Sequence, residues 1–572
     1  MSSSGEHETG PEGGRADSGT SRQGRVVRAA REGGCVSAAL SVLAGCVVWA
    51  ALVMPTDPAR TQAAGLLRIP VEGVVLTVLA LVLPSRVRRG VALALGVLLG
   101  VLTLLKGLDA GFQLVLLRPF DMLNDWSYLP SAAGVLTDWI GQGWTALVVV
   151  VVGLLAALVL AGLPVATARA VTDLARHRGT VAIVFPALTA TVLATALPGV
   201  SLVPASMLFS ASTSAVVADT AGHLQRDLAD RAIFARQIAT DPVAEGSAAA
   251  ALSGLRGKDV LLVFVESYGR VALDDPELAP SVRSALGQAD EDLRRAGFIT
   301  RSAYLESPTF GGVSWLAHAT VQSGLWVDSQ QRYNQLLTAE RLTLTRAFGA
   351  AGWRTVVDAP AIDRPWPAGR SFYGFDTAYT STDVGYHGPR FGYATMPDQY
   401  TLEAFAAREL APGHQPVMAE IDLLSSHYPW TSPPPLLLPR DVVGDGSVFA
   451  HPEARAPDAV AAQAPSRAIY AASIGYAVRA VASFVASSDD PGLVVLVMGD
   501  HQPKSPVTSS GASRQVPVML ITADPQVLHR TTGWGWTPGL DPGPDAPVWP
   551  MSAVRDRVLT DLGSGVTPGA GG

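Results

Sequence analysis

The sequence predicts an N-terminal bundle of five transmembrane helices, followed by an α/β domain whose mostly parallel central sheet lies between helices. Two observations predict this fold. Five long apolar stretches lie before residue 205, and short apolar runs alternate with helical patterns after about residue 256. The composition agrees: 48% of the residues are hydrophobic and only 16% are charged, which is little charge for a soluble chain of 572 residues.

The apolar stretches are each close to the ~20 residues that a bilayer-spanning helix needs. They cover residues 36–55, 66–84, 90–107, 143–164 and 181–203. The N-terminal arm, the turn at 86–89 and the loop at 165–180 are rich in arginine, whereas the intervening loops are not. Because basic loops stay in the cytoplasm, we expect a cytoplasmic N-terminus and an extracytoplasmic chain after about residue 205.

The two cysteines, Cys35 and Cys46, both lie at the first apolar stretch. The rest of the chain therefore has no disulfide, no thiolate metal site and no cysteine nucleophile. An outer domain without disulfides is ordinary for bacteria, so the predicted location is the bacterial plasma membrane. The outer loop 108–141 is rich in aromatic residues; it either meets lipid headgroups or anchors the neighbouring spans, and its role stays open.

The predicted organisation has five parts. They are a disordered cytoplasmic tail 1–32, a transmembrane domain 33–206, a helical juxtamembrane connector 207–250, an extracytoplasmic α/β domain 251–535, and a Pro/Gly-rich C-terminal tail 536–572 with a short helix. Within the α/β domain, two apolar runs predict buried strands at 259–266 and 492–500. The net charge is −7 and no long basic run occurs, so no nucleic-acid partner is expected.

Both predicted strands end in residues that can bind a cation. The first run ends at Glu266, and the second ends at Asp500 and His501. In open parallel sheets, ligands bind at the carboxyl ends of the strands. Carboxylate and imidazole together suit zinc, manganese or magnesium. The alternative is that these residues are only helix N-caps that follow strands.

A third segment offers a nucleophile. A Gly311-Gly312 loop leads into Ser314, where a helical pattern begins. The free N–H groups and the dipole of a helix N-terminus favour an anion there. Serine is a weak nucleophile at its ordinary pKa, and coordination to a metal can activate it. The alternative is that Ser314 is an N-cap, and Thr309 is a rival nucleophile.

The residues Glu266, Ser314, His427, Asp500 and His501, in this order, resemble the alkaline-phosphatase superfamily. Within it, they resemble the sulfatase-like branch, which includes lipoteichoic-acid synthases and phosphoethanolamine transferases. The spacing from Ser314 to Ser323-Gly324 matches that from the sulfatase cysteine to its Thr-Gly pair. This spacing favours Ser314 over Thr309. Because Ser314 stands where sulfatases have cysteine, a phosphotransferase is favoured over a sulfatase.

The resemblance implies an alkaline-phosphatase-like fold and a set of residue roles. One divalent ion (Mn²⁺, Zn²⁺ or Mg²⁺) is expected on Glu266, Ser314, Asp500 and His501. Ser314 is the expected nucleophile and His427 the expected acid or phosphate contact. Substrate binding is expected from His318, Trp366, Arg370 and His427. The chain departs from the family in that His318 replaces a sulfatase arginine and Trp366 and Arg370 are spaced differently.

The function that the resemblance implies is a membrane-anchored phosphotransferase. It moves a phosphoglycerol or phosphoethanolamine headgroup from a membrane lipid to a glycan or lipid of the cell envelope through a phospho-serine intermediate. One alternative is a phosphodiester or sulfate-ester hydrolase with water as acceptor. A non-enzymatic alternative is a membrane scaffold with a degenerate catalytic domain. The oligomeric state and the identities of donor and acceptor stay open.

Overall fold

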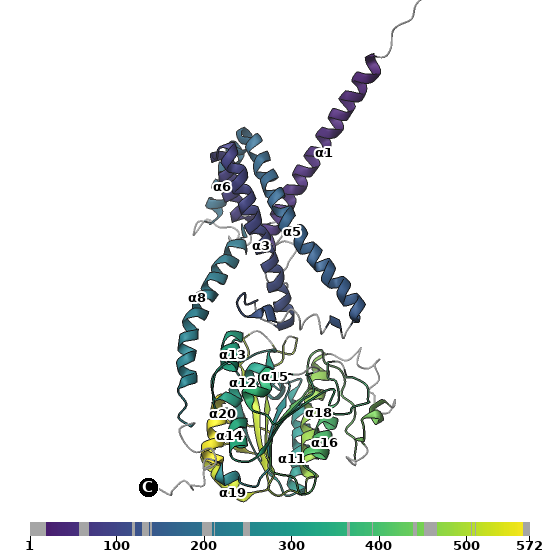
Figure 1. The fold of residues 1–572 in the computed structure, drawn as a ribbon, viewed down its shortest axis with the longest axis vertical. Helices are drawn as coiled ribbons and strands as arrows, with labels where there is room; N and C mark the ends of the chain where they lie inside the picture. The colour runs from purple at the N-terminus through teal and green to yellow at the C-terminus, as the bar shows by residue number, and fades with distance from the viewer. Residues whose placement is uncertain are drawn as a thin grey trace, which may run out of the picture. The chain divides into compact units, whose positions relative to one another are not determined.

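The structure is a computed structural model that describes residues 19–55, 68–116, 120–127, 136–137, 140–196, 209–210, 212–243, 252–362, 366–391, 393–438, 443–450, 466–504, 506–508 and 511–563. The chain separates into two compact units (Figure 1). The N-terminal unit comprises Met1–Met122 and Trp126–His223, and the C-terminal unit comprises Leu123–Asp125 and Leu224–Gly572.

The N-terminal unit is helical. Its elements are α1 (Gly19–Val53), α2 (Val71–Val82), α3 (Ser85–Leu116), α5 (Gln142–Arg176), α6 (Arg178–Ala196), the first half of α8 (Ser212–Ala239), a 3-10 turn (Asp125–Ser127) shared with the other unit, and the short paired strands β1 (Ile69–Pro70) and β2 (Phe209–Ser210). Helix α1 begins at Gly19, so the tail predicted as disordered is helical from there. Its alanines and arginines are good helix formers that continue the span.

Three helices of this unit are long and apolar enough to cross a membrane. They are Val36–Val53, Ser85–Gln113 and Gln142–Arg176, which correspond to the first, third and fourth predicted spans. The second and fifth predicted spans coincide with the shorter apolar helices Val71–Val82 and Arg178–Ala187. Part of each, 66–67 and 197–203, lies outside the described residues. A membrane protein is therefore indicated, while the count of five spans stays a prediction.

Helices α3 and α5 approach each other closely at Gly96. A Cβ added there would lie 2.4 Å from Cα of Pro164, so only glycine fits. In the outer loop, Phe120 packs edge-on against Phe112 and Trp126, with ring centroids 5.0 and 5.1 Å apart. The described part of this loop is thus held by its own aromatic residues.

Lys106 of α3 is fully buried and ties three helices together. Its Nζ donates to the carbonyl oxygens of Ala51 (3.0 Å) and Leu52 (3.3 Å), at the end of α1. It also donates to Ser212 Oγ (2.9 Å) and Thr213 Oγ1 (2.8 Å), at the start of α8. A lysine at a helix C-terminus satisfies carbonyls that have no partner within the helix. Lys106 thereby fixes the beginning of the connecting helix α8.

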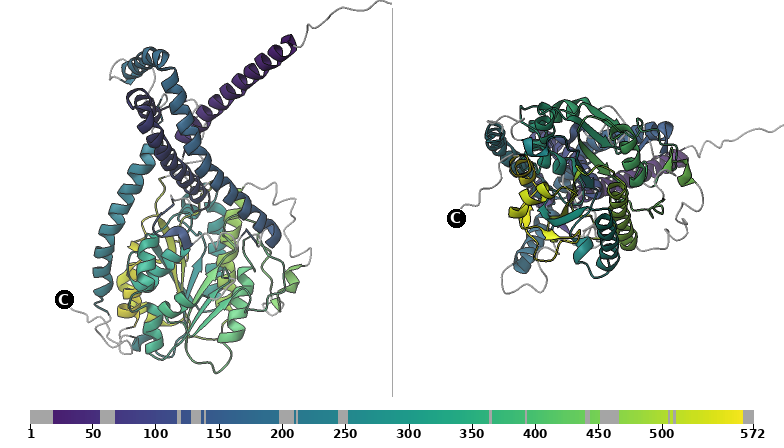
Figure 2. Two further views of the ribbon diagram at one scale, coloured as in Figure 1. Left: turned by 45° about the horizontal axis from the view of Figure 1, so that its top comes forward. Right: turned by 90° about the horizontal axis from the view of Figure 1, so that it is seen from below.

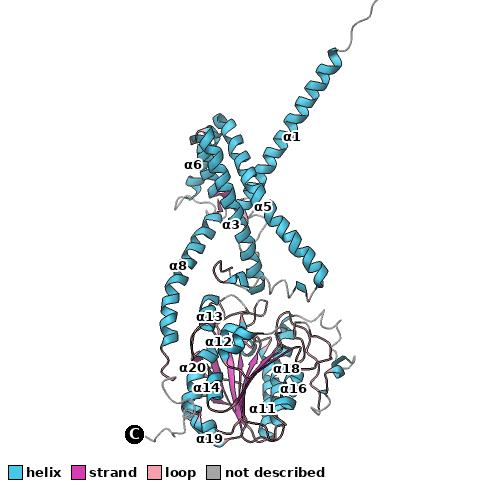
Figure 3. Cartoon of the chain, in the orientation of Figure 1, coloured by secondary structure: helices cyan, strands magenta, loops and turns pink. Residues whose placement is uncertain are grey.

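The C-terminal unit contains a nine-stranded sheet, ordered β10-β4-β9-β8-β3-β7-β5-β6, with β11 also paired to β4 (Figure 3). The strands are β3 (Val260–Val265), β4 (Ile299–Glu306), β5 (Arg354–Ala359), β6 (Thr377–Thr380), β7 (Val417–Leu423), β8 (Val494–Gly499), β9 (Gln515–Thr522), β10 (Thr537–Pro538) and β11 (Val548–Pro550). The predicted α/β domain is confirmed, but its sheet is mixed. Strands β8, β3, β7, β5 and β6 are parallel, whereas β9 is antiparallel to both β8 and β4.

Helices cover both faces of the sheet (Figures 1 and 2). One face is covered by α11 (Ala279–Arg295), α16 (Asp398–Glu409) and α18 (Ser466–Ala486). The other is covered by α12 (Ser314–Ser323), α14 (Leu344–Ala350), α19 (Pro525–Arg530), α20 (Ala553–Arg557) and a π-helical turn (Val558–Leu562). The remaining helices are α10 (Val271–Asp274), α13 (Gln330–Leu337) and α15 (Pro367–Tyr373), with 3-10 turns at Ser253–Leu255, Ser447–Ala450 and Thr532–Trp534. Helix α18 has the length and composition of a membrane span, but it is largely buried in this domain.

The segment predicted as a separate C-terminal tail is part of this domain. Strands β10 and β11 pair with β4, and α20 follows them. Met551, Leu559 and Leu562 are each at most 1% exposed, which ties the segment to the core. The reason for the difference is that the stretch just before these residues, 538–550, is rich in proline and glycine, which hides the short strands that pair with β4. Residues 564–572 lie outside the described part of the chain.

Candidate active site

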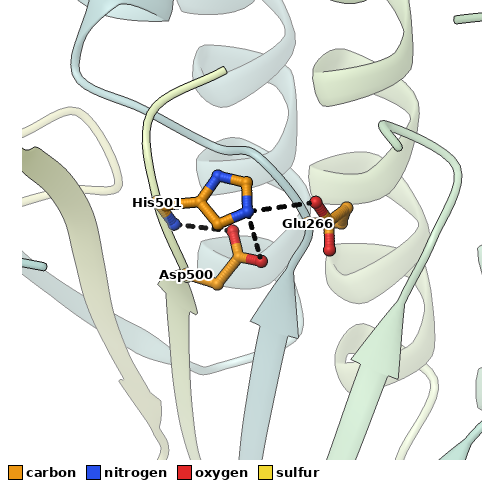
Figure 4. Close-up of side chains that lie close together, drawn as sticks. All are labelled: Glu266, Asp500 and His501. Carbon is orange, nitrogen blue, oxygen red and sulfur yellow. Dashed lines mark hydrogen bonds and ion pairs between the residues drawn. The ribbon is translucent and has the colours of Figure 1, made fainter. Parts of the chain in front are cut away.

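The parallel strands β8 and β3 are neighbours, so their carboxyl ends bring together residues that are far apart in the sequence. Glu266 follows β3, and Asp500 and His501 follow β8 (Figure 4). All three are buried, and each offers a ligand atom within 4.8 Å of the other two. His501 Nε2 lies 3.4 Å from Glu266 Oε1 and 3.5 Å from Asp500 Oδ2.

Hydrogen bonds orient these side chains toward a common point. The backbone N–H groups of Ser267 and His501 both donate to Asp500 Oδ1, at 2.7 Å. The ring Nδ1–H of His501 donates to the carbonyl oxygen of Gln502 (2.9 Å), so the lone pair of Nε2 faces the acids. Asp500 Oδ2 is buried and accepts no hydrogen bond from the described residues. Acceptor lone pairs that point toward one place, with no hydrogen-bond donor between them, fit a divalent cation.

Ser314 points into the same group from the first position of α12. Its Oγ lies 3.0 Å from Glu266 Oε2 and 3.2 Å from His501 Nε2. The N-cap position of α12 is Val313, whose side chain makes no capping hydrogen bond. The alternative that Ser314 is an N-cap is therefore wrong. Glu266 is not an N-cap either, because the first helix after β3 is α10, and the N-cap of α10 is Arg270.

Backbone strain surrounds these ligands. Ser267 (φ 56°) and Val313 (φ 60°) are the residues other than glycine with positive φ in the described part of the chain. Ser267 directly follows Glu266 in the chain, and Val313 directly precedes Ser314. A β-branched residue in the left-handed region costs on the order of 1–3 kcal/mol, and such strain is typically kept at functional sites. Here it turns Ser314 toward the acids.

Thr309, the rival nucleophile, has different surroundings. It is buried, and its Oγ1 makes no hydrogen bond to the described residues. Its backbone N–H donates to the hydroxyl oxygen of Ser307 (3.2 Å), which fixes the loop. Of the two hydroxyl groups, only that of Ser314 contacts the cluster among the described residues.

His427 lies in the loop after β7, next to Glu266. The hydroxyl of Ser426 donates to the carbonyl oxygen of Glu266 (2.5 Å), which ties the two loops together. The His427 ring stacks on Tyr393, with centroids 3.7 Å apart. Its Nδ1 is buried and has no hydrogen-bond partner among the described residues. One ring nitrogen of His427 is therefore available to a ligand.

The buried charges shift the protonation of these groups. Burial opposes ionisation of Glu266, but His427, His501 and the hydroxyl of Ser267 outweigh it and lower the pKa of Glu266 to about 2. Burial, followed by the charge of Glu266, raises the pKa of Asp500 to about 7. Burial lowers the pKa of His427, and Glu266 opposes that shift. At neutral pH, His427 is thus poised as a neutral base.

The structure gives His318 neighbours that the sequence did not predict. His318 lies one turn after Ser314 in α12, and its Nδ1 is 3.0 Å from Glu420 Oε1 and 3.5 Å from Asp422 Oδ1. Both acids come from β7, and the three residues form a second group with ligand atoms within 4.8 Å of one another. An anion is repelled from this nitrogen by the two carboxylates. The signal in the sequence was an acidic pair two residues apart inside an apolar run, 417–423.

Trp366 and Arg370 line a cavity of about 330 Å³ at the ends of β5 and β6. Arg370 lies in α15, and its guanidinium donates to the carbonyl oxygens of Phe375 (3.3 Å) and Asp376. Asp383 lines the same cavity. These hydrogen bonds of Arg370 do not reach Ser314 or the acids of the cluster, so the structure does not bring Trp366 and Arg370 into the cluster with Ser314.

Comparison with known proteins gives matches to solved structures, while no family model and no curated protein sequence matches the chain. One match is the lipoteichoic acid synthase LtaP from Listeria monocytogenes, with 16% identity over 55% of this chain and 75% of that chain and a TM-score of 0.38. Another is a protein in the alkaline phosphatase superfamily from Vibrio parahaemolyticus (14% identity, 54% and 67%, TM-score 0.34). A third is the phosphoglycerol transferase GacH from Streptococcus pyogenes, in complex with sn-glycerol-1-phosphate (15% identity, 59% and 93%, TM-score 0.35).

One of the three, the protein from Vibrio parahaemolyticus, is described as a member of the alkaline phosphatase superfamily, and the other two are described as a synthase and a transferase. At TM-scores below 0.5, the overlap is too small to transfer a mechanism from one structure to another. The chemistry of the site therefore follows from the contacts of Ser314, Glu266, Asp500 and His501 themselves.

Proposed function

We propose that the protein is a membrane-anchored, metal-dependent phosphotransferase. It moves a phospho-headgroup of the phosphoglycerol or phosphoethanolamine type from a membrane lipid to a glycan or lipid of the cell envelope, through a phospho-serine intermediate on Ser314. The observation that carries this proposal is the position of the Ser314 hydroxyl. It lies at a helix start and within 3.2 Å of both Glu266 and His501.

Glu266, Asp500, His501 and Ser314 are the residues that would hold a divalent cation. Their fit rests on the converging lone pairs and on Asp500 Oδ2, which is buried without a partner among the described residues. When bound, such an ion supplies Lewis-acid stabilisation of negative charge at Ser314 Oγ and at the phosphoryl oxygens. The donor set of carboxylates, imidazole and hydroxyl suits Mn²⁺, Zn²⁺ or Mg²⁺.

The chemical step is a displacement at phosphorus. Ser314 Oγ gives up its proton and forms the Oγ–P bond, while the bond from phosphorus to the lipid oxygen breaks and that oxygen takes up the proton, so that the lipid leaves as a neutral alcohol. Glu266 Oε2 accepts a hydrogen bond from the Ser314 hydroxyl, and His501 Nε2 lies 3.2 Å from it, so both groups favour loss of its proton. In the second step, an acceptor hydroxyl attacks phosphorus, its proton leaves, and the Oγ–P bond breaks. The N–H groups at the start of α12 favour the anionic phosphoryl group.

His427 is proposed as the group that handles the proton of the leaving oxygen or contacts the phosphate. Its Nδ1 is free of hydrogen bonds to the described residues, and its ring is fixed by stacking on Tyr393. Burial lowers its pKa and favours a neutral ring before the reaction, and a neutral ring can take up the proton that Ser314 releases and pass it to the leaving oxygen. Because stacking fixes the orientation of the His427 ring, we expect the ring to act on one particular group of the substrate.

The cavity beside Trp366 and Arg370 is proposed to bind part of the substrate. Trp366 offers an apolar wall, and Arg370 offers the guanidinium N–H groups that its backbone contacts leave unused. Asp383 in the same cavity would suit an amine or a hydroxyl. His318, the other predicted substrate residue, does not line this cavity, and its two acidic neighbours argue against direct binding of a phosphate.

The membrane helices are proposed to keep this domain near its lipid substrate. Three described helices are long and apolar enough to span a bilayer. The arginine-rich loops support an orientation with the N-terminus in the cytoplasm and the α/β domain outside. A tethered enzyme meets lipid headgroups at a high effective concentration.

The proposal is tested with phospholipids that carry a labelled headgroup. The purified full-length protein in detergent is incubated with labelled phosphatidylglycerol or phosphatidylethanolamine, with and without a glycan acceptor, and the products are separated. We expect diacylglycerol and labelled acceptor. Ser314→Ala should form neither, while Thr309→Val, which removes a buried hydroxyl that contacts no cluster residue, should keep wild-type activity.

The outcomes separate the alternatives. Labelled free headgroup phosphate in place of labelled acceptor indicates hydrolysis. Full activity of Ser314→Ala contradicts the nucleophile assignment. If the wild-type protein binds no divalent ion and turns over no lipid, the scaffold alternative is correct.

A further inference from the structure

The second cluster of metal-ligating side chains is formed by His318, Glu420 and Asp422. His318 Nδ1 lies 3.0 Å from Glu420 Oε1 and 3.5 Å from Asp422 Oδ1. The corresponding distances from His501 Nε2 to its two acids in the first cluster are 3.4 and 3.5 Å. The two clusters therefore have the same donor types, one imidazole and two carboxylates, at similar separations.

The fold builds this cluster from one strand and one helix. Glu420 and Asp422 are two residues apart in β7, so their side chains leave the same face of the sheet. Phe264, on the neighbouring strand, lies in register with Asp422, and the His318 ring stacks on it with centroids 3.9 Å apart. The stacking fixes the plane of the imidazole, and its Nδ1 faces both acids.

A second layer of hydrogen bonds orients Glu420. Gln322, one turn after His318 in α12, donates to Glu420 Oε2 (2.6 Å). The amide oxygen of Gln322 accepts from the backbone N–H and the hydroxyl of Thr345, at 3.1 and 3.0 Å. Glu420 Oε1 is thereby directed at His318. Outer partners that orient a ligand in this way are a general feature of metal sites.

Among the described residues, His318 is the only group that can supply a positive charge to the two acids of the cluster. In the described part of the chain, neither Glu420 nor Asp422 pairs with a lysine or an arginine. Asp422 Oδ1 is buried and accepts no hydrogen bond from any described residue. Two acids thus share one imidazole in a region where an uncompensated charge is costly. The side chains of His318 and Asp422 are 14% and 18% exposed, which leaves an entry path for an ion.

We propose that His318 Nδ1, Glu420 and Asp422 form a second divalent-cation site, separate from the site on Glu266, Asp500 and His501. One nitrogen and two carboxylate oxygens select an ion of the Mn²⁺ or Zn²⁺ class over Mg²⁺ and Ca²⁺, which prefer oxygen alone. Ser314 and His318 are one turn apart on α12, so an ion here also fixes the helix that carries the nucleophile. The site stands independently of the reaction proposed for Ser314.

The competing state is a protonated His318 that forms ion pairs with the two acids and binds no metal. The two states differ in stoichiometry. The full-length protein in detergent is stripped with a chelator and titrated with Mn²⁺, and free Mn²⁺ is followed by its electron paramagnetic resonance signal. We expect about two Mn²⁺ per chain for the wild type and about one for Asp422→Asn.

Two further variants make the result specific. Glu266→Gln should leave about one ion, and the double variant Glu266→Gln/Asp422→Asn should leave none. Asp358→Asn is a matched control, because Asp358 is a buried acid of the neighbouring strand β5 that is outside the cluster. It should still bind about two ions. Thermal unfolding of each variant shows whether it is folded, and His318→Asn replaces Asp422→Asn if the latter unfolds.

The proposal is overturned if the wild type binds about one ion and Asp422→Asn binds the same ion with the same affinity. It is also overturned if Asp358→Asn reduces the stoichiometry as much as Asp422→Asn does. If instead Glu266→Gln keeps both ions, the first site and the proposed function fail while the second site stands.

Discussion

The two clusters of the α/β domain contain the same donor types, but they are held in different ways. In the first cluster, Asp500 accepts two backbone N–H groups, and a hydroxyl contacts Glu266 and His501. In the second, Glu420 is held only by side chains, and no hydroxyl points at the acids in the described part of the chain. The difference teaches which cluster is suited to the proposed reaction: only the first combines the proposed cation ligands with the proposed nucleophile at a helix start.

The largest expected effect separates the clusters by activity. Glu266→Gln should lower headgroup transfer by ~10³-fold or more, because it removes a ligand and an acceptor next to Ser314. Asp422→Asn should lower it by only ~10-fold, because Asp422 does not contact Ser314. Initial rates with labelled lipid, measured at saturating Mn²⁺, check both values. Equal losses of activity in the two variants would contradict the claim that only the first cluster takes part in the reaction.

A second prediction concerns a buried acid that accepts no hydrogen bond from the described residues. Asp358 of β5 is fully buried, and neither of its carboxylate oxygens has a hydrogen-bond partner among the described residues. Burial, followed by the charge of Asp422, raises its pKa to about 8. Between the unfolded pKa near 4 and about 8, the folded state binds more protons than the unfolded state. Asp358 therefore costs stability progressively as the pH rises through that window.

Asp358→Asn should remove this cost. The variant should match the wild type at about pH 4 and exceed it at pH 8 by a few kcal/mol, on the order that ~1.4 kcal/mol per pKa unit implies. Chemical denaturation at both pH values, on the same chelator-treated protein, measures the difference. A wild-type advantage that stays constant with pH would show that Asp358 has a partner or is not buried.

A third prediction concerns the close contact between the loops after β3 and β8. A Cβ on Gly499 would lie 2.0 Å from the carbonyl oxygen of Tyr268, a backbone atom that cannot move freely. Gly499→Ala should therefore destabilise the protein by about 2 kcal/mol and weaken Mn²⁺ binding at the first cluster. The second cluster should keep its ion, which the Mn²⁺ titration shows. Gly287→Ala, where a Cβ meets no atom within 4 Å, is the matched control.

The smallest expected effect tests the strain before the nucleophile. Val313 has φ 60°, which glycine adopts without cost. Val313→Gly should relieve on the order of 1 kcal/mol of strain, while it lowers turnover because Ser314 is held less firmly. Thermal unfolding and initial rates, measured on the same sample, check that stability rises while turnover falls. A variant that loses stability and keeps full activity would show that the strain has no role at the site.

The sequence predicted the first cluster because its signals lie at the ends of two apolar runs. The predicted strands 259–266 and 492–500 correspond to β3 and β8, and the rule that ligands gather at carboxyl ends joined Glu266 to Asp500 and His501. The second cluster was missed because Glu420 and Asp422 interrupt β7, which made that run look unlike a buried strand. The acids inside β7 are explained only by the structure, because their partner His318 is far away in the sequence and lies beside them in the fold.

Other differences have similar causes. The sheet is mixed because β9 is antiparallel, and an apolar run such as 515–522 has the same pattern in either direction. The C-terminal segment joins the core through a few apolar residues that follow the Pro/Gly-rich stretch 538–550, and so short a segment carries little local pattern. The second predicted span is a short helix, α2, because Arg68 and Glu72 at its start are polar.

The most direct test of the central claim is mass spectrometry of the full-length protein after incubation with phosphatidylglycerol or phosphatidylethanolamine and rapid quenching. The account predicts that the mass of one headgroup phosphate is added to the peptide that contains Ser314, and that this adduct is absent from Ser314→Ala and disappears when an acceptor is supplied. An adduct on Thr309 or His427, or product formation with Ser314→Ala, would contradict it.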